Sequence, residues 1–110
     1  MFKINAAPTF SCRVMLSIAG SDTPVPVSVT FRHLTARAYS AWHARLGAGS
    51  VAESLHEIVA GWGEGFVDDD GKPVPYTAEA LALLLDQHPS AGVELHDAYV
   101  RQLFHARAKN

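Results

Sequence analysis

The residues whose types could do chemistry gather in one stretch, GWGEGFVDDDGKPVPYT, at residues 61–77. Its three consecutive aspartates before a glycine invite the hypothesis of a calcium loop. An EF-hand loop needs a carboxylate at its first and last ligand positions, because all its ligands must converge on one ion. With Gly71 as the turn glycine of such a loop, those two positions hold Phe66 and Thr77, which carry no carboxylate. We therefore expect a solvated Asp-Gly turn and no metal site.

The alternating glycines of the same stretch raise a second hypothesis, a cradle for a phosphate. A dinucleotide-binding loop places its glycines between a strand and a helix, and a P-loop adds a Gly-Lys-Ser/Thr sequence. Here the glycines follow a predicted helix, aspartates that would repel an anion come next, and no Gly-Lys-Ser/Thr follows. We therefore expect no phosphate or cofactor at this position.

The six histidines form no catalytic or metal-binding pattern. No two stand four residues apart, as a zinc-binding pair on one helix face does, and no Gly-x-Ser-x-Gly turn offers a nucleophile. The single cysteine, Cys12, lies in an alternating apolar run and is expected to be a small core residue. We therefore predict no catalytic residue, no metal and no enzyme. A small hydrolase or metal-dependent enzyme is the alternative that the scattered histidines leave open.

The composition is typical of one folded domain. The chain has 110 residues, of which 48% are apolar and 18% charged, and its formal net charge is −2. This length supports one hydrophobic core. Basic residues form no cluster, so we expect no nucleic-acid partner. Because no apolar run reaches the length of a membrane span or of a signal-peptide core, we expect a cytoplasmic protein without a membrane partner.

Two stretches near the start alternate between apolar and polar residues with the period of a strand. The sequence Gly-Ser-Asp-Thr-Pro lies between them and is typical of a turn. We therefore predict a β-hairpin over residues 9–33. Pro24 and Pro26 cannot donate main-chain hydrogen bonds, so we expect the second strand to begin irregularly or to lie at an edge. The side chains expected to face the core are Phe10, Cys12, Val14, Leu16, Ile18, Val25, Val27, Val29 and Phe31.

After the hairpin the apolar spacing changes to that of helices, and we predict about four short helices over residues 34–110. The first ends near Gly47. The second begins at Ser50, where Glu53 completes a capping box, and its apolar face continues through Trp62.

The third predicted helix begins after Thr77 and ends before Pro89, and the fourth runs from about residue 92 to residue 107. The fold class is therefore α+β, a hairpin followed by helices in a single compact domain over residues 1–110. The apolar stripe expected on the last helix consists of Val93, His96, Tyr99, Val100, Leu103 and Phe104.

The second half of the chain, over about residues 58–110, resembles a known family. A tryptophan ends one helix, an acidic Asp-Gly-x-Pro-Val-Pro-Tyr-Thr segment follows, and a leucine-rich helix closes near a proline. In this order, the residues resemble the small tail assembly chaperones of tailed bacteriophages and prophages. Gly63 and Gly65 depart from the shorter connection of that family. The residues that carry the resemblance are Trp62, Asp69, Asp70, Gly71, Pro73, Val74, Pro75, Tyr76, Thr77, Leu81, Leu84, Leu85, Pro89, Tyr99 and Asn110.

The resemblance implies a non-enzymatic protein that binds the tape measure protein in the host cytoplasm during tail morphogenesis, with the tail tube protein as a second candidate partner. Such capture calls for an exposed apolar groove or an edge strand. A small prophage-encoded adaptor or regulatory module is the alternative, and self-association is left open. Trp42 and Trp62 are expected to be core residues, with a role as aromatic anchors in a partner interface as the alternative. The residues expected to bind the partner are Trp62, Phe66, Tyr76, Leu81, Leu84 and Leu85.

Overall fold

The predicted β-hairpin is present in the computed structural model, which describes residues 1–104. Strand β1 (Thr9–Leu16) pairs antiparallel with β2 (Val25–Arg32) along its whole length. Val14, Leu16, Val27, Val29 and Phe31 are buried, as the alternation predicts. Ile18 and Val25 are exposed instead, because Ile18 lies in the connecting loop beyond β1 and Val25 is the first residue of β2.

A third strand, β3 (Val59–Trp62), extends the hairpin to a three-stranded antiparallel sheet of order β1-β2-β3. Val59 lies opposite Phe31 of β2, and Trp62 lies opposite Val29. The prediction that the second helix continues through Trp62 is therefore wrong. Either conformation buries Val59 and Trp62, but Gly61 costs about 1 kcal/mol in a helix interior, and β-branched Val59 fits a strand better.

Strand β2 is the central strand, so the expectation that the prolines place it at an edge is also wrong. The main-chain groups of Ser28 bond with Gly63 and Glu64 after β3. Alternate residues of a strand direct these groups to the same side, so the nitrogen of Pro26 faces this side too. Because β3 pairs only with later residues of β2, the missing N–H of Pro26 breaks no hydrogen bond of the sheet.

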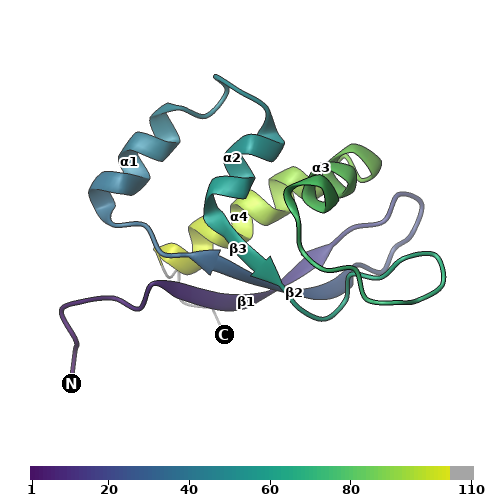
Figure 1. The fold of residues 1–110 in the computed structure, drawn as a ribbon, viewed down its shortest axis with the longest axis horizontal. Helices are drawn as coiled ribbons and strands as arrows, with labels where there is room; N and C mark the ends of the chain where they lie inside the picture. Colours follow the sequence, from purple (N-terminus) through teal and green to yellow (C-terminus); the bar gives the residue numbers. More distant parts are fainter. Residues whose placement is uncertain (105–110) are drawn as a thin grey trace.

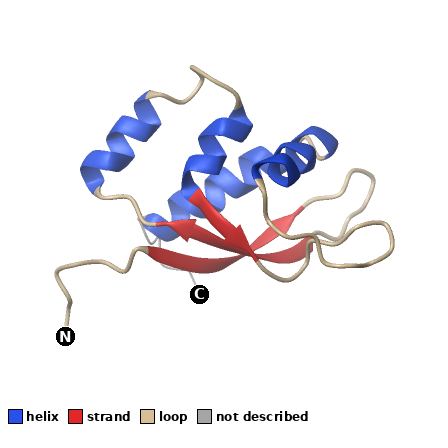
Figure 2. Ribbon diagram, in the orientation of Figure 1, coloured by secondary structure: helices blue, strands red, loops and turns tan. Residues whose placement is uncertain are grey.

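The four predicted helices are present as α1 (Ala36–Ala44), α2 (Val51–Ile58), α3 (Ala78–Gln87) and α4 (Ala91–Leu103). All of them lie on one face of the sheet (Figures 1 and 2). The first three begin at side chains that accept a hydrogen bond from the first turn, and α2 has the predicted capping box. The capping residues are Thr35, Ser50 and Thr77.

Helix α4 buries the predicted stripe only in part. Tyr99 is buried and Leu103 packs against the core, as predicted, whereas Val93 and Phe104 are exposed and Ala91 and Leu95 are buried instead. The helix begins at Ala91, and residues spaced by four from there form its inner face. The predicted continuation to residue 107 lies outside the described residues.

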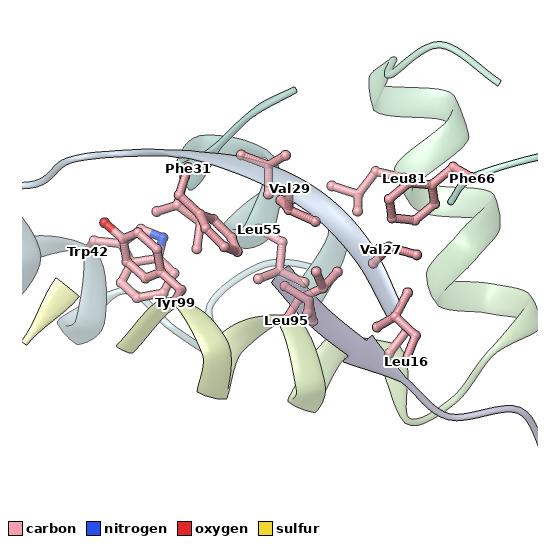
Figure 3. Packing of buried hydrophobic residues seen from close by; sticks show 14 residues of the cluster. Leu16, Val27, Val29, Phe31, Trp42, Leu55, Phe66, Leu81, Leu95 and Tyr99 are labelled. Carbon is pink, nitrogen blue, oxygen red and sulfur yellow. The ribbon is translucent and has the colours of Figure 1, made fainter. Parts of the chain in front are cut away.

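The core fills the space between the sheet and the helices, and Figure 3 shows its packing. At one end Tyr99 of α4 packs against Phe31 of β2 and Trp42 of α1, with ring centroids 5.1 and 5.7 Å away. At the other end lie Phe66 and Leu81. One continuous core thus joins all elements into a single α+β domain. Among residues 1–104 no helix is long and apolar enough to cross a membrane.

Of the two extra glycines in the connection after Trp62, Gly65 is the one that the fold requires. Its φ is +110°, and a Cβ there would lie 2.7 Å from Cγ1 of Val27 and 3.0 Å from the main-chain oxygen of Pro26. Only glycine allows the loop to lie this close to β2.

We predict that Gly65→Ala lowers the free energy of unfolding by about 2 kcal/mol or more, because it combines an unfavourable φ with a clash against main-chain atoms. Gly71→Ala is the matched control, since Gly71 has a φ of +77° but a Cβ at this position would meet no atom within 4 Å. That change should cost about 1 kcal/mol. Urea unfolding measures both, and equal losses would contradict the close approach at Gly65.

Candidate partner-binding surface

The segment that follows β3 folds back on an aromatic cluster, defined here as Trp62, Phe66 and Tyr76. Trp62 stacks on Phe66 with ring centroids 3.9 Å apart and meets Tyr76 edge to face at 4.9 Å. Its indole Nε1 donates a 2.7 Å hydrogen bond to the main-chain oxygen of Val74. The Tyr76 hydroxyl lies 2.6 Å from Nδ1 of His56 in α2. These contacts tie the segment to β3 and to α2.

The Asp-Gly turn at the tip of this segment uses a carboxylate to hold its own main chain. Oδ1 of Asp68 accepts 2.9 Å hydrogen bonds from the N–H groups of Asp70 and Lys72. Gly71, at a φ of +77°, donates its N–H to the main-chain oxygen of Asp68. Asp68 therefore acts as a turn residue. Among residues 1–104 no group of three or more His, Cys, Asp or Glu side chains could hold a metal ion.

A groove of about 370 Å³ opens on the helical side of the molecule. We call it the helical groove. Its walls come from the α1–α2 connection, the first half of α2, the end of α3 and the start of α4. No Asp, Glu, Lys or Arg side chain of the described residues lines it. The apolar residues that line it include Trp42, Leu46, Val51, Leu85, Pro89 and Val93.

Two apolar side chains on the helical groove are left in solvent. Val51 at the start of α2 is 59% exposed, and Val93 in the first turn of α4 is 64% exposed. Gly92 lets these two helices approach each other, since a Cβ there would lie 3.2 Å from Cγ1 of Val51. An exposed apolar surface around an uncharged hollow is typical of a site that binds an apolar segment.

The floor of the helical groove is a buried, hydrogen-bonded tryptophan. Trp42 is 2% exposed, and its indole Nε1 donates a 3.0 Å hydrogen bond to the main-chain oxygen of Ser54 in α2. The ring of His96 stacks on Trp42 with centroids 5.8 Å apart. Nδ1 of His96 lies 3.5 Å from Asp97, and its buried Nε2 has no hydrogen-bond partner among the described residues. Trp42 is thus a core residue, as expected, that also forms part of the groove.

The structure distributes the six residues expected to bind a partner over three environments. Phe66 and Leu81 are buried in the core, and Trp62, Tyr76 and Leu84 are half-buried against it. Leu85 lines the helical groove. The sequence did not point to Val51, Val93 or Pro89, because their places in the groove depend on how three helices meet. A capping box before Val51 was the one local signal, and it indicated only where a helix starts.

We predict that Trp62→Ala lowers the free energy of unfolding by about 3 kcal/mol, because the change removes the stack on Phe66 and the hydrogen bond to Val74. Trp62→Phe keeps an aromatic ring on Phe66 and loses only the N–H donor, so it should cost about 1 kcal/mol. Thermal or urea unfolding distinguishes the two. A Trp62→Ala variant as stable as the natural chain would mean that the indole is not part of the core.

Comparison with known proteins identifies the family of the chain. A family model described as phage tail assembly chaperone matches residues 1–110, the whole chain. No match was found among curated proteins or among solved structures. The chain therefore belongs to the phage tail assembly chaperone family, as the resemblance of residues 58–110 predicted.

Proposed function

We propose that the chain is a non-enzymatic chaperone of the host cytoplasm that binds an apolar segment of the tape measure protein in the helical groove during tail assembly. Membership of the tail assembly chaperone family supports a role in assembly. The tail tube protein is a second candidate partner for the same groove.

The observation that carries the proposal is the exposed apolar surface around the helical groove. Val51 and Val93 are exposed to water beside an uncharged hollow, and this exposure does not stabilise the isolated chain. An amphipathic helix binds such a groove by inserting side chains spaced by three or four residues. The apolar lining offers such a helix no ion pair, so the bound segment is expected to present an uncharged apolar face.

The residues assigned from the sequence have different roles in this proposal. Leu85 contacts the bound segment directly from α3. Leu81 and Leu84 on the same helix hold α3 against the core and so position Leu85. The aromatic cluster of Trp62, Phe66 and Tyr76 fixes the segment that leads into α3. We therefore propose direct binding for Leu85 and a positioning role for the other five.

We predict that Val93→Glu lowers the affinity for the tape measure protein at least tenfold, because it places a charge on the rim of an apolar groove. Isothermal titration or co-purification after joint expression measures the loss. The stability of the chain should change by only about 0.5 kcal/mol, since the side chain is mostly exposed.

Leu83→Glu is the matched control for this experiment. Leu83 is 61% exposed on α3, against 64% for Val93, but does not line the groove. This variant should bind as the natural chain does. If both variants lose the same affinity, the partner is bound elsewhere. If the natural chain itself forms no complex with the tape measure protein, the proposed function is overturned.

A further inference from the structure

Strand β1 is an edge strand whose outer side is free. Alternate residues of β1 direct their main-chain N–H and C=O groups toward β2. The residues between them direct these groups away from the sheet, and they are Thr9, Ser11, Arg13 and Met15. Within residues 1–104 these outward groups make no hydrogen bond. The free edge ends at Ser17, whose main-chain N–H donates a 2.9 Å hydrogen bond to Oε1 of Glu94 in α4. Free, regular edges of this length are sites for pairing with another strand.

Exposed large apolar side chains lie beyond or at both ends of β1. An N-terminal arm, residues 1–8, extends from the start of β1 (Figure 1) and leaves Phe2 and Ile4 each 92% exposed. At the other end, Met15 is 45% and Ile18 is 44% exposed. An antiparallel partner strand of the same sequence would bring each arm against the opposite end of the other copy.

We propose that the free edge of β1 pairs antiparallel with β1 of a second copy about a two-fold axis at Cys12, joining two sheets into one. In this register Ser11 lies opposite Arg13 of the second copy, and Phe10 lies opposite its Val14. Within the paired β1 strands no like charges face each other. Shifting the axis to Arg13 would set two arginines directly opposite each other, which is unfavourable.

The charges of α4 support the same axis independently. Ser17 contacts Glu94, and the ring of Phe10 stacks on that of Tyr99 at 5.9 Å, so α4 runs antiparallel to β1 with its middle level with Cys12. A two-fold axis at that level places Glu94 of one copy near Arg101 of the other. Both residues, with Asp97, line a hollow of about 230 Å³ whose other lining residues include Arg13 and Met15 of β1. Glu94 of each copy thus meets Arg101 of the other copy, while the two Asp97 side chains lie near the axis.

The central pair gives a direct test. Opposite residues of a non-hydrogen-bonded antiparallel pair have Cα atoms about 4.5 Å apart, within the range for a disulfide. Two Cys12 thiols should therefore be oxidised to an intermolecular disulfide by diamide, which takes up the two hydrogens. Burial raises the pKa of the Cys12 thiol, so the reaction should be run above neutral pH. Light scattering of the reduced chain should give twice the mass of 11.9 kDa.

A pair of substitutions at one exposed position tests the register. Ser11→Lys sets a second cation opposite Arg13 of the second copy and should raise the dimer dissociation constant about fivefold, since each change counts twice. Ser11→Glu should lower it by a similar factor. Both variants lose the same hydrogen bond between Ser11 and Thr30, so they are matched in their effect on the monomer.

Opposite shifts for the two Ser11 variants, together with a Cys12 disulfide, would establish the pairing. A chain that stays monomeric at all concentrations would overturn it. A dimer that forms no Cys12 disulfide and responds equally to both variants would show that another surface mediates association. If the chain is monomeric and only the tape measure protein protects Cys12 from diamide, a strand of that partner occupies the edge instead.

Discussion

The contacts of one side chain, Tyr99, hold the helical layer to the sheet. Its ring is fully buried and packs against Phe10 of β1, Phe31 of β2 and Trp42 of α1. Its hydroxyl donates a 3.0 Å hydrogen bond to the main-chain oxygen of Arg32. Burial, with a smaller contribution from nearby Tyr39, raises the pKa of Tyr99 to about 12, so this hydroxyl stays a donor at neutral pH. Three other elements thus depend on the place of α4.

Once α4 is fixed in this way, its two outer sides serve different surfaces. Gly92 and Val93 contribute to the helical groove, whereas Glu94 and Arg101 line the hollow beside the free edge of β1. The lining of the groove and the lining of that hollow share no residue among those described. Binding of a segment in the groove and pairing of two copies at the edge are therefore compatible, and a dimer would present two grooves at once.

Local patterns predicted the elements well and their arrangement less well. The hairpin followed from alternation, and the starts of α2 and α3 followed from the capping residues Ser50 and Thr77, because both signals act within a few residues. Strand β3 was missed, since Val59 and Trp62 are buried equally well by a helix or a strand and only the pairing with β2 decides between them. The central place of β2 depends on the same missed strand.

The candidate site was predicted in part for a related reason. The aromatic cluster and Leu85 lie in the segment that carries the family resemblance, so sequence drew attention to them. The groove itself depends on the approach of α2 to α4 at Gly92, a contact between residues far apart in the sequence. Exposure of Val93 likewise depends on the inner face of α4, which begins at Ala91 rather than one residue later.

Binding of the tape measure protein in the helical groove can be tested directly. Hydrogen–deuterium exchange is measured by mass spectrometry on the free chain and on its complex with the tape measure protein. Slower exchange in the complex over residues 46–55 and 89–96, with little change over residues 66–74, is the predicted result. A stable complex whose added protection lies only on the Asp-Gly turn or on the uncovered face of the sheet would contradict it.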